Sequence, residues 1–302
     1  MITVRMGKGT MTGNLLHPAR HLATLLCIFI LTIHPAAAAT VEAKLPTGTI
    51  ASADFRAGQA ARPAALLLHG FLQTRHAPPI SSLTNTLSDQ GYTVLTPTLS
   101  LGINQRTKSL GCEAVHTHTL EGDIAEISFW VNWLANKGYG SIALIGHSFG
   151  STQILYYLAQ KPNPAVKKAI LTSWVPLRSK PQEMQKTLAR VKQSRASEQI
   201  LDRFTLSYCN SNYVAPPAAY LSYVTNDSSK NLDQLSKTKM PVEVIMGAAD
   251  TSMESSWPEK IRARGIPVTV MNNAGHFFDG AQEFDLADKV ESILKALPAG
   301  NQ

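Results

Sequence analysis

Residues 141–150 read Ser-Ile-Ala-Leu-Ile-Gly-His-Ser-Phe-Gly and are the most informative ten residues of this 302-residue chain. The run from Ser141 to Ile145 is apolar and compact, as in strands that are buried on both faces of a sheet. The residues from Thr152 to Gln160, which follow, have the composition of a helix. The motif Gly-x-Ser-x-Gly at Gly146 to Gly150 therefore lies at a turn from a strand to a helix.

The two glycines of this motif have a steric role. A serine held at a sharp turn needs residues without side chains two positions before and after it, because strand and helix pack closely there. The bare pattern arises by chance in about one 300-residue chain in ten, since Gly and Ser each make up about 7% of average sequences. Its position between strand and helix is what makes Ser148 a candidate nucleophile rather than part of an ordinary glycine turn.

The rest of the chain alternates short apolar runs with segments of helical period, which predicts an α/β fold with a mostly parallel central sheet and helices on both faces. The predicted strands are Ala64–Leu68, Thr93–Leu95, Ser141–Ile145, Ala169–Thr172, Val242–Met246 and Val268–Met271, with Thr49–Phe55 as an antiparallel edge. The clearest helix has apolar residues spaced from Leu120 to Leu134, and Thr119 is placed to cap its start. A second stripe from Leu286 to Leu297 predicts a C-terminal helix.

Residues 177–239 interrupt this alternation with a polar stretch whose apolar residues have partly helical spacing. We predict a helical lid that is inserted over the sheet, where a substrate would enter. Four tyrosines of this stretch can line a pocket or pack within the lid, and packing is the favoured interpretation. They are Tyr208, Tyr213, Tyr220 and Tyr223.

A serine hydroxyl is a poor nucleophile at neutral pH, so it needs a base, and the base needs an orienting carboxylate. Asp250 and His276 each follow a predicted strand by a few residues. Because the carboxyl ends of parallel strands share one edge of a sheet, we predict that Ser148, Asp250 and His276 meet there. The rivals of Asp250 for the carboxylate role are Asp227, in the insertion, and Asp279, just beyond the histidine.

Attack by a serine on a carbonyl group creates an oxyanion, which needs a pair of hydrogen-bond donors. The backbone N–H of Phe149 is one candidate, because it begins the helix after the serine and the helix dipole favours negative charge there. The second donor is expected from His69-Gly70-Phe71-Leu72, which follows a predicted strand. The Phe71 amide is favoured and the Leu72 amide is the alternative, unless this segment is only a turn that ends the strand.

From Thr49 to Leu297 the chain resembles the α/β-hydrolase superfamily. The resemblance rests on four features in order, which are the His69-Gly70 loop, the serine motif, the Asp250 turn and the Gly275-His276 pair. It implies the α/β-hydrolase fold and a serine esterase or lipase activity with a Ser-Asp-His triad, without a cofactor or a metal. The serine in the motif argues against haloalkane dehalogenases, which have an aspartate at that position.

One segment departs from the pattern of the superfamily. Many members have an Asp and a Gly-rich loop after the second parallel strand, whereas this chain has Thr96-Pro97-Thr98-Leu99-Ser100-Leu101-Gly102. That loop shapes the pocket rather than the chemistry, so the departure leaves the substrate class open. We expect a hydrolase that forms an acyl-enzyme on Ser148, with a carboxylic ester as its small-molecule substrate. The alternatives are a peptidase or amidase, an acyltransferase with the same triad, and a binding protein that keeps the fold without the chemistry.

The first 39 residues differ from the rest of the chain. They contain three positive charges, an apolar run from Leu22 to Ile33 that is too short to span a membrane, and four alanines at 36–39. This predicts a signal peptide over residues 1–39, cleaved after one of the last two alanines, ahead of a single domain of residues 40–302. The protein is then periplasmic or secreted and has no membrane span, and an uncleaved anchor is the alternative.

Charge and cysteine content limit the partners. Loss of the leader lowers the formal net charge from +7 to about +4, and no run of Lys and Arg with interleaved aromatics predicts nucleic-acid binding. In an oxidising compartment Cys112 and Cys209 can form a disulfide, and two buried free thiols are the alternative. Cys112 lies close to His116 and His118, but no second cluster with zinc spacing follows, so no metal site is predicted.

Overall fold

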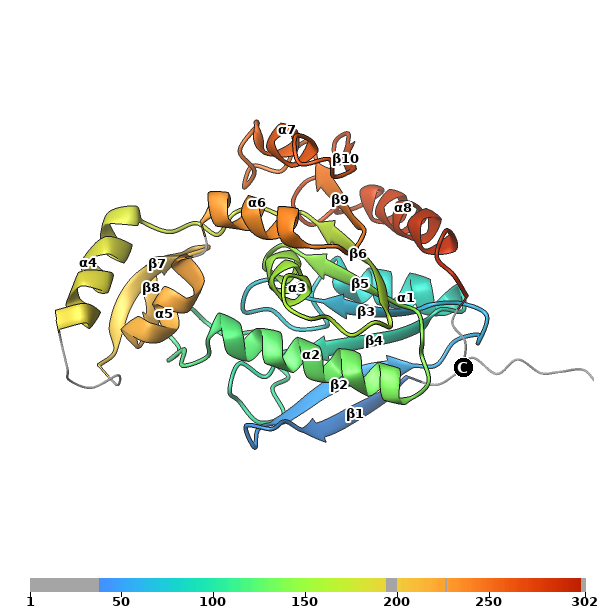
Figure 1. Ribbon diagram of the computed structural model, residues 1–302, viewed down its shortest axis with the longest axis horizontal. Coiled ribbons are helices and arrows are strands. Elements are labelled where there is room, and N and C mark those ends of the chain that lie inside the picture. Colours follow the sequence, from blue (N-terminus) through green and yellow to red (C-terminus); the bar gives the residue numbers. More distant parts are fainter. Residues whose placement is uncertain (1–37, 194–199, 226, 300–302) are drawn as a thin grey trace, which may run out of the picture. The chain divides into compact units, whose positions relative to one another are not determined.

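An eight-stranded sheet organises the residues described by the computed structural model, which are 38–193, 200–225 and 227–299 (Figure 1). Its strand order is β1-β2-β4-β3-β5-β6-β9-β10, and only β2 runs antiparallel to its neighbours. The strands are β1 (Ala39–Lys44), β2 (Ile50–Arg56), β3 (Ala64–Leu68), β4 (Thr93–Thr98), β5 (Ile142–His147), β6 (Val166–Thr172), β9 (Val242–Gly247) and β10 (Val268–Met271). The predicted mostly parallel sheet is therefore confirmed.

The predicted edge strand was misplaced by one position in the sheet. The segment predicted as Thr49–Phe55 forms β2, which is antiparallel as expected, but β1 pairs along its free side and forms the true edge. The strand β1 escaped prediction because its sequence has only weak apolar alternation and follows directly after the alanines of the predicted leader. Residues 1–37 of that predicted signal peptide lie outside the described residues.

Two apolar cores cover the faces of the sheet, and β3 shows how one strand serves both. Leu66 and Leu68 pack in the first core with α2 and α3, whereas Ala65 and Leu67 pack in the second with α1 and α8. Burial of each leucine side chain contributes about 2 kcal/mol through removal of apolar surface from water. The bounds are α1 (Ile80–Asp89), α2 (Leu120–Asn136), α3 (Phe149–Leu158), α7 (Trp257–Arg262) and α8 (Gln282–Lys295).

The signals predicted for the long helix are present in the structure. The Thr119 side chain accepts a hydrogen bond from the Gly122 amide at the start of α2, as predicted for its cap. Asp123 and Glu126 are on the buried face of α2, although carboxylates usually lie at the surface of a protein. The C-terminal helix α8 ends at Lys295, shortly before Pro298.

The insertion between β6 and β9 was predicted as helical, and this is wrong for one part of it. It contains α4 (Pro181–Gln193), α5 (Pro217–Val224) and α6 (Ser228–Lys237), but also a hairpin of β7 (Asp202–Leu206) and β8 (Cys209–Ala215). Polar residues at 210–212 interrupt any apolar alternation in β8, so the sequence did not indicate this strand. Figure 1 shows α4, α5 and the hairpin grouped together on the left.

A disulfide joins Cys112 to Cys209, which confirms the predicted pair. It connects the loop before α2 to the first residue of β8, and His116 N–H also donates to the Val214 carbonyl at 2.8 Å. The Cys112 sulfur is consequently not available to a metal as a thiolate. Among the residues that the structure describes, no group of three or more His, Cys, Asp or Glu side chains could hold a metal ion.

No helix within residues 38–193, 200–225 or 227–299 is both long enough and apolar enough to cross a membrane. The longest described helix, α2, has 17 residues and carries two acidic side chains in its first turn.

Candidate active site

The backbone at Ser148 has an uncommon conformation. Ser148 lies between β5 and α3 with a φ of 53° and a ψ of −120°, in a region that L-residues rarely adopt. Its amide donates to the Thr172 carbonyl of β6 at 2.9 Å, which fixes the turn to the sheet. Strain of this kind persists only where the surroundings impose it, and it places the Ser148 hydroxyl at the carboxyl edge of the sheet.

The glycines of the motif permit this turn, as the sequence predicted. A Cβ atom on Gly146 would lie 2.7 Å from the Ser151 Cα atom, so Gly146 allows the contact between strand and helix. A Cβ atom on Gly150 would lie 2.5 Å from the His69 carbonyl oxygen. Gly150 therefore allows α3 to approach the end of β3. The sequence analysis had expected both glycines to serve the contact between α3 and the strand that precedes Ser148.

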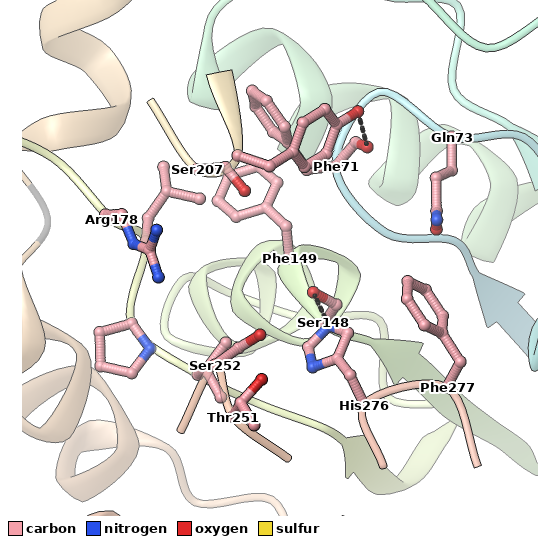
Figure 2. A pocket seen from close by; sticks show the side chains of 14 residues that line it. Phe71, Gln73, Ser148, Phe149, Arg178, Ser207, Thr251, Ser252, His276 and Phe277 are labelled. Atoms are coloured by element: carbon pink, nitrogen blue, oxygen red, sulfur yellow. Dashed lines mark hydrogen bonds between the residues drawn. The ribbon is translucent and has the colours of Figure 1, made fainter. Parts of the chain in front are cut away.

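Ser148, His276 and Asp250 are joined by consecutive hydrogen bonds. The His276 Nε2 atom lies 2.9 Å from Ser148 Oγ, as Figure 2 shows, and the His276 Nδ1 atom lies 2.7 Å from Asp250 Oδ2. A carboxylate only accepts hydrogen bonds, so Nδ1 carries the proton in the second contact. The Nε2 atom is then free to accept the hydroxyl proton of Ser148.

Asp227 and Asp279, the other candidates for the carboxylate that orients the histidine, lie elsewhere. Asp227 caps α6, where its carboxylate accepts a hydrogen bond from the Lys230 amide at 2.9 Å. Asp279 is exposed beyond the histidine. His147, which precedes the serine, is fully buried, and burial together with the nearby His276 holds its pKa well below the ordinary value. Within the described residues, the ring that contacts Ser148 Oγ is that of His276, and the carboxylate that contacts this ring is that of Asp250.

The Asp250 carboxylate is kept in its charged form. Burial alone would raise its pKa, but the hydrogen bond from His276, the charge of that ring and the bonds from Ser252 outweigh burial and lower the pKa. The Ser252 amide donates to Asp250 Oδ1 at 2.8 Å. Both carboxylate oxygens are therefore used, one to orient the His276 ring and one to fix the loop after β9.

The loops that carry Asp250 and His276 are bonded to each other. The Ala249 amide donates to the Ala274 carbonyl at 2.9 Å, and a Cβ atom on Gly247 would lie only 2.2 Å from that carbonyl oxygen. Gly247 is thus needed for the close approach of the two loops, although the sequence analysis did not identify it. The signal that could have found it is a glycine placed directly after the predicted strand Val242–Met246, where it forms the last residue of β9.

The two amides predicted to bind an oxyanion lie beside Ser148. Phe149 is the first residue of α3, so its N–H has no acceptor within the helix. Phe71 follows Gly70, where an added Cβ atom would lie 3.4 Å from the Ser148 Cβ atom. In the described part of the chain neither amide hydrogen has an acceptor, and both residues line the cavity at Ser148. Leu72, the alternative donor, does not line this cavity.

His69 orients the peptide that carries the Phe71 amide. Its Nε2 atom accepts a hydrogen bond from the Leu99 amide at 3.1 Å, so the proton is on Nδ1, which donates to the Gly70 carbonyl at 2.8 Å. Burial, reinforced by the charge of Arg106, lowers the pKa of His69 to about 3, which keeps the ring neutral. Since a trans peptide directs its C=O and N–H to opposite sides, the Phe71 N–H points away from His69.

Arg106 is a second supporting residue, and the sequence analysis missed it. This buried guanidinium donates to four carbonyl oxygens, those of Leu99 at 2.6 Å, Gln73 at 2.8 Å, Lys108 at 2.9 Å and Leu72 at 3.5 Å. Burial lowers its pKa to about 10, so it stays charged at neutral pH. Nothing in the local pattern indicated this role, because the carbonyls of Leu72, Gln73 and Leu99 come from loops that only the fold brings close to Arg106.

A cavity of about 440 Å³ opens onto Ser148 and His276. The insertion forms one of its walls with Leu177, Arg178, Ser207 and Tyr208. Tyr208 is the one tyrosine of the predicted four that lines the cavity, and its hydroxyl donates to the Phe71 carbonyl at 3.2 Å. The other three are buried within the insertion and around α2, as favoured from the sequence.

Comparisons with known proteins agree with this architecture. A family model described as alpha/beta hydrolase fold matches residues 63–211. The alpha/beta hydrolase GrgF from Penicillium sp. sh18 is similar to this chain with a TM-score of 0.68 and 14% identity, over 86% of this chain and 98% of that one. Est1E from Butyrivibrio proteoclasticus is similar with a TM-score of 0.59 and 15% identity, over 87% of this chain and 100% of that one.

An esterase from Pyrococcus furiosus is also similar, with a TM-score of 0.56 and 19% identity over 86% of this chain and 92% of that one. A search of curated proteins found no significant match. The strand order, the turn at Ser148 and the matching family model together define a class of protein. The chain belongs to the α/β-hydrolase superfamily.

Proposed function

We propose that this protein is a serine hydrolase that cleaves carboxylic esters through an acyl-enzyme on Ser148. The observation that carries the proposal is the unbroken hydrogen-bond chain from Asp250 through His276 to Ser148. This chain ends at a cavity where two amide hydrogens, of Phe71 and Phe149, have no acceptor among the described residues. A nucleophile, a base and oxyanion donors are the parts that acyl transfer requires.

In the first half of the proposed reaction, Ser148 Oγ attacks the ester carbonyl carbon while His276 Nε2 takes the hydroxyl proton. The carbonyl oxygen becomes an oxyanion, which the Phe71 and Phe149 amides bind. The intermediate then collapses, the bond to the alcohol oxygen breaks, and the His276 Nε2 proton passes to the departing alcohol. The acyl group remains on Ser148 as an ester.

In the second half, a water molecule gives a proton to His276 Nε2 and attacks the acyl carbon. The bond to Ser148 Oγ breaks, His276 returns the proton to that oxygen, and the carboxylic acid leaves. Asp250 stays ionised throughout and stabilises the imidazolium that forms in each half, as its lowered pKa supports. One ester and one water thus yield one acid and one alcohol.

Turnover of a substrate panel tests the proposal. We expect the purified protein to hydrolyse short-chain p-nitrophenyl esters faster than the matching p-nitroanilides, because p-nitrophenolate is a better leaving group than p-nitroaniline. Ser148→Ala should lower kcat by about a thousandfold or more while the far-UV circular dichroism stays unchanged. Equal turnover by this variant and the wild type would overturn the proposal, and faster cleavage of the anilides would favour the amidase alternative. Acyl transfer to an added alcohol would favour the acyltransferase alternative.

We also propose that the protein is exported. The predicted signal peptide over residues 1–39 and the Cys112–Cys209 disulfide support this, because disulfides persist in oxidising compartments. Expression of the full chain in a Gram-negative bacterium, followed by fractionation and intact mass measurement, tests it. We expect a periplasmic protein that lacks 38 or 39 residues and carries no free thiol. An uncleaved cytoplasmic product with three free thiols, those of Cys27, Cys112 and Cys209, would contradict export.

A further inference from the structure

We propose that the substrate of this site carries a carboxylate, which Arg178 binds in the cavity. This inference rests on the proposed function, since it names the substrate class of the same site. Arg178 lies at the start of the insertion and lines the cavity together with Ser148 and His276. Figure 2 shows Arg178 on one side of the cavity and Gln73 and Phe277 on the other, with Ser148 and His276 between them.

The charge of the cavity is unbalanced. Arg178 is the only Lys or Arg among the described residues that line it, and no Asp or Glu lines it. Asp250, the nearest carboxylate of the site, is fully buried behind His276 and is used by that ring and by Ser252. A ligand that enters this cavity therefore meets one uncompensated positive charge, which favours an anion.

Among the described arginines of the insertion, Arg178 differs from Arg190 and Arg203 in the contacts of its guanidinium. Arg190 forms an ion pair with Asp202, and Arg203 donates to the Asn212 side chain. Within the described residues, the Arg178 side chain has neither an ion pair nor a hydrogen bond.

The backbone of Arg178 is nevertheless held in place. The Arg178 carbonyl accepts a hydrogen bond from the Ser207 amide at 2.8 Å, and the next residue, Ser179, forms a bridge with Leu206 of β7. The base of the Arg178 side chain is thus fixed against the turn of the hairpin. Binding through this side chain requires less ordering than binding through an arginine on an unsupported loop.

Hydroxyl groups accompany the guanidinium. Ser207 and Thr251 line the cavity, and in the described part of the chain their hydroxyls have no hydrogen-bond partner. A carboxylate has two oxygens and accepts a bidentate pair of hydrogen bonds from a guanidinium, with further bonds from neighbouring hydroxyls. One arginine matches the single charge of a carboxylate, whereas a phosphate monoester carries close to two charges at neutral pH.

The substrate class that follows is an ester with a carboxylate some atoms away from the ester bond. The charge can belong to the acyl part, as in a half ester of a dicarboxylic acid, or to the alcohol part. The cavity volume of about 440 Å³ is large enough for either. In both cases Arg178 acts on specificity and does not take part in the chemistry at Ser148.

Two pairs of matched substrates test the inference. The first pair is methyl hexanoate and monomethyl adipate, and the second is butyl hexanoate and its analogue with a carboxylate at the end of the butyl chain. We expect the wild type to prefer the charged member of at least one pair. In Arg178→Gln, kcat/KM for that charged ester should fall by about 10- to 100-fold through a higher KM, while the neutral esters change less than about twofold.

The control variant is Arg203→Gln, which removes the same charge from the insertion outside the cavity. It should leave both members of each pair unchanged, and Arg178→Glu should lower the charged-ester activity further than Arg178→Gln. An active enzyme whose preference is the same with and without the Arg178 charge would overturn the inference. An equal loss on charged and neutral esters would also overturn it, because it would indicate a structural role.

The failure of this inference and the failure of the proposed function give different results. If Arg178 does not select the substrate, the wild type still cleaves neutral esters and Ser148 is still modified by a fluorophosphonate. If the proposed function is wrong, neither neutral nor charged esters are cleaved by the folded wild type. Melting curves of all variants show whether a change in activity reflects loss of fold.

Discussion

Ser148, His276 and Asp250 each follow a strand of the parallel sheet by at most five residues, and this placement is why they could be predicted. The pattern around Ser148 predicted its turn, and the ends of β9 and β10 predicted the other two positions. Two supporting residues, His69 and Arg106, could not be assigned their roles. Their contacts are with carbonyl and amide groups of loops that are distant in sequence, which no local pattern encodes.

Asp250→Asn tests the role of the buried carboxylate. An asparagine amide can donate to His276 Nδ1 and so stabilise the tautomer in which Nε2 carries the proton, which leaves Ser148 without a base. We expect kcat to fall by about 10³- to 10⁴-fold with little change in KM. Steady-state kinetics on one p-nitrophenyl ester measures this. A loss smaller than tenfold, in a variant with the wild-type melting temperature, would contradict the assigned role.

The buried carboxyl group of Asp123, in α2, is expected to make the stability of the protein depend on pH. Burial raises its pKa to about 7, against the hydrogen bonds from Tyr223 and Gln153 that lower it. The folded state therefore holds a proton that the unfolded state loses near pH 4, so this group makes the protein less stable as pH rises from about 4 to 7. Above pH 7 its contribution stays constant.

Asp123→Asn should remove this dependence. The amide oxygen can still accept from Tyr223 and Gln153, and no buried charge forms at high pH. We expect the variant to unfold at a higher denaturant concentration than the wild type at pH 8, with the difference shrinking toward pH 4. Urea denaturation at both pH values measures it. A variant that is less stable than the wild type at pH 8 would show that the carboxylate is stabilising.

At the scale of elements, strands with compact apolar sequences were predicted well and strands with polar sequences poorly. The buried strand β3 and the half-buried edge strand β10 both have the predicted bounds, because compact apolar runs with turn residues at each end leave little choice. β4 extends past its predicted end at Leu95 through Pro97, which is tolerated because beyond Leu95 the strand pairs only with β2. β1, β7 and β8 carry polar residues and are held by pairing with a neighbour, so local sequence did not indicate them.

The approach of the loops after β9 and β10 depends on Gly247. A Cβ atom there would lie 2.2 Å from the Ala274 carbonyl, so Gly247→Ala must push the histidine loop away. We expect a loss of about 1 to 3 kcal/mol in unfolding free energy, together with a lower kcat from displacement of His276. Denaturation and kinetics measure the two effects.

The matched control is Gly122→Ala in α2. A Cβ atom at Gly122 would meet the Thr119 hydroxyl at 3.6 Å, an ordinary contact, and alanine favours helix over glycine. This variant should be as stable as the wild type or more so, with the same kcat. If Gly247→Ala behaves as the control does, close packing at Gly247 does not position the two loops.

At the scale of the whole molecule, the disulfide connects the insertion to the sheet domain. Cys112 and Cys209 are 97 residues apart in sequence, so the bond closes a long loop in the unfolded chain. In the chain-entropy account such a loop stabilises the folded state by up to about 4 to 5 kcal/mol. The Cys112→Ala, Cys209→Ala double variant should therefore melt well below the wild type in differential scanning calorimetry. Melting temperatures that agree within a degree would contradict this contribution.

The whole fold was predictable because its superfamily has a distinctive order of motifs, and the substrate was not. The residues that surround Ser148 in space come partly from the insertion. Arg178 precedes α4 in the sequence and Ser207 follows β7, yet both line the cavity. Only the three-dimensional structure shows that Arg178 and Ser207 share a cavity with His276. The residues that determine specificity can thus be found only in the folded molecule, whereas the candidate nucleophile can be found from one local sequence motif.

Covalent modification by a fluorophosphonate is the most direct measurement of the central claim, that Ser148 is a nucleophile activated by His276 and Asp250. After incubation at pH 8, we expect one adduct per chain by intact mass, mapped by peptide fragmentation to Ser148. Ser148→Ala should show no adduct, and His276→Ala should react at a rate lower by about a thousandfold or more. An adduct on another residue, or a folded wild type that remains unmodified, would contradict the account.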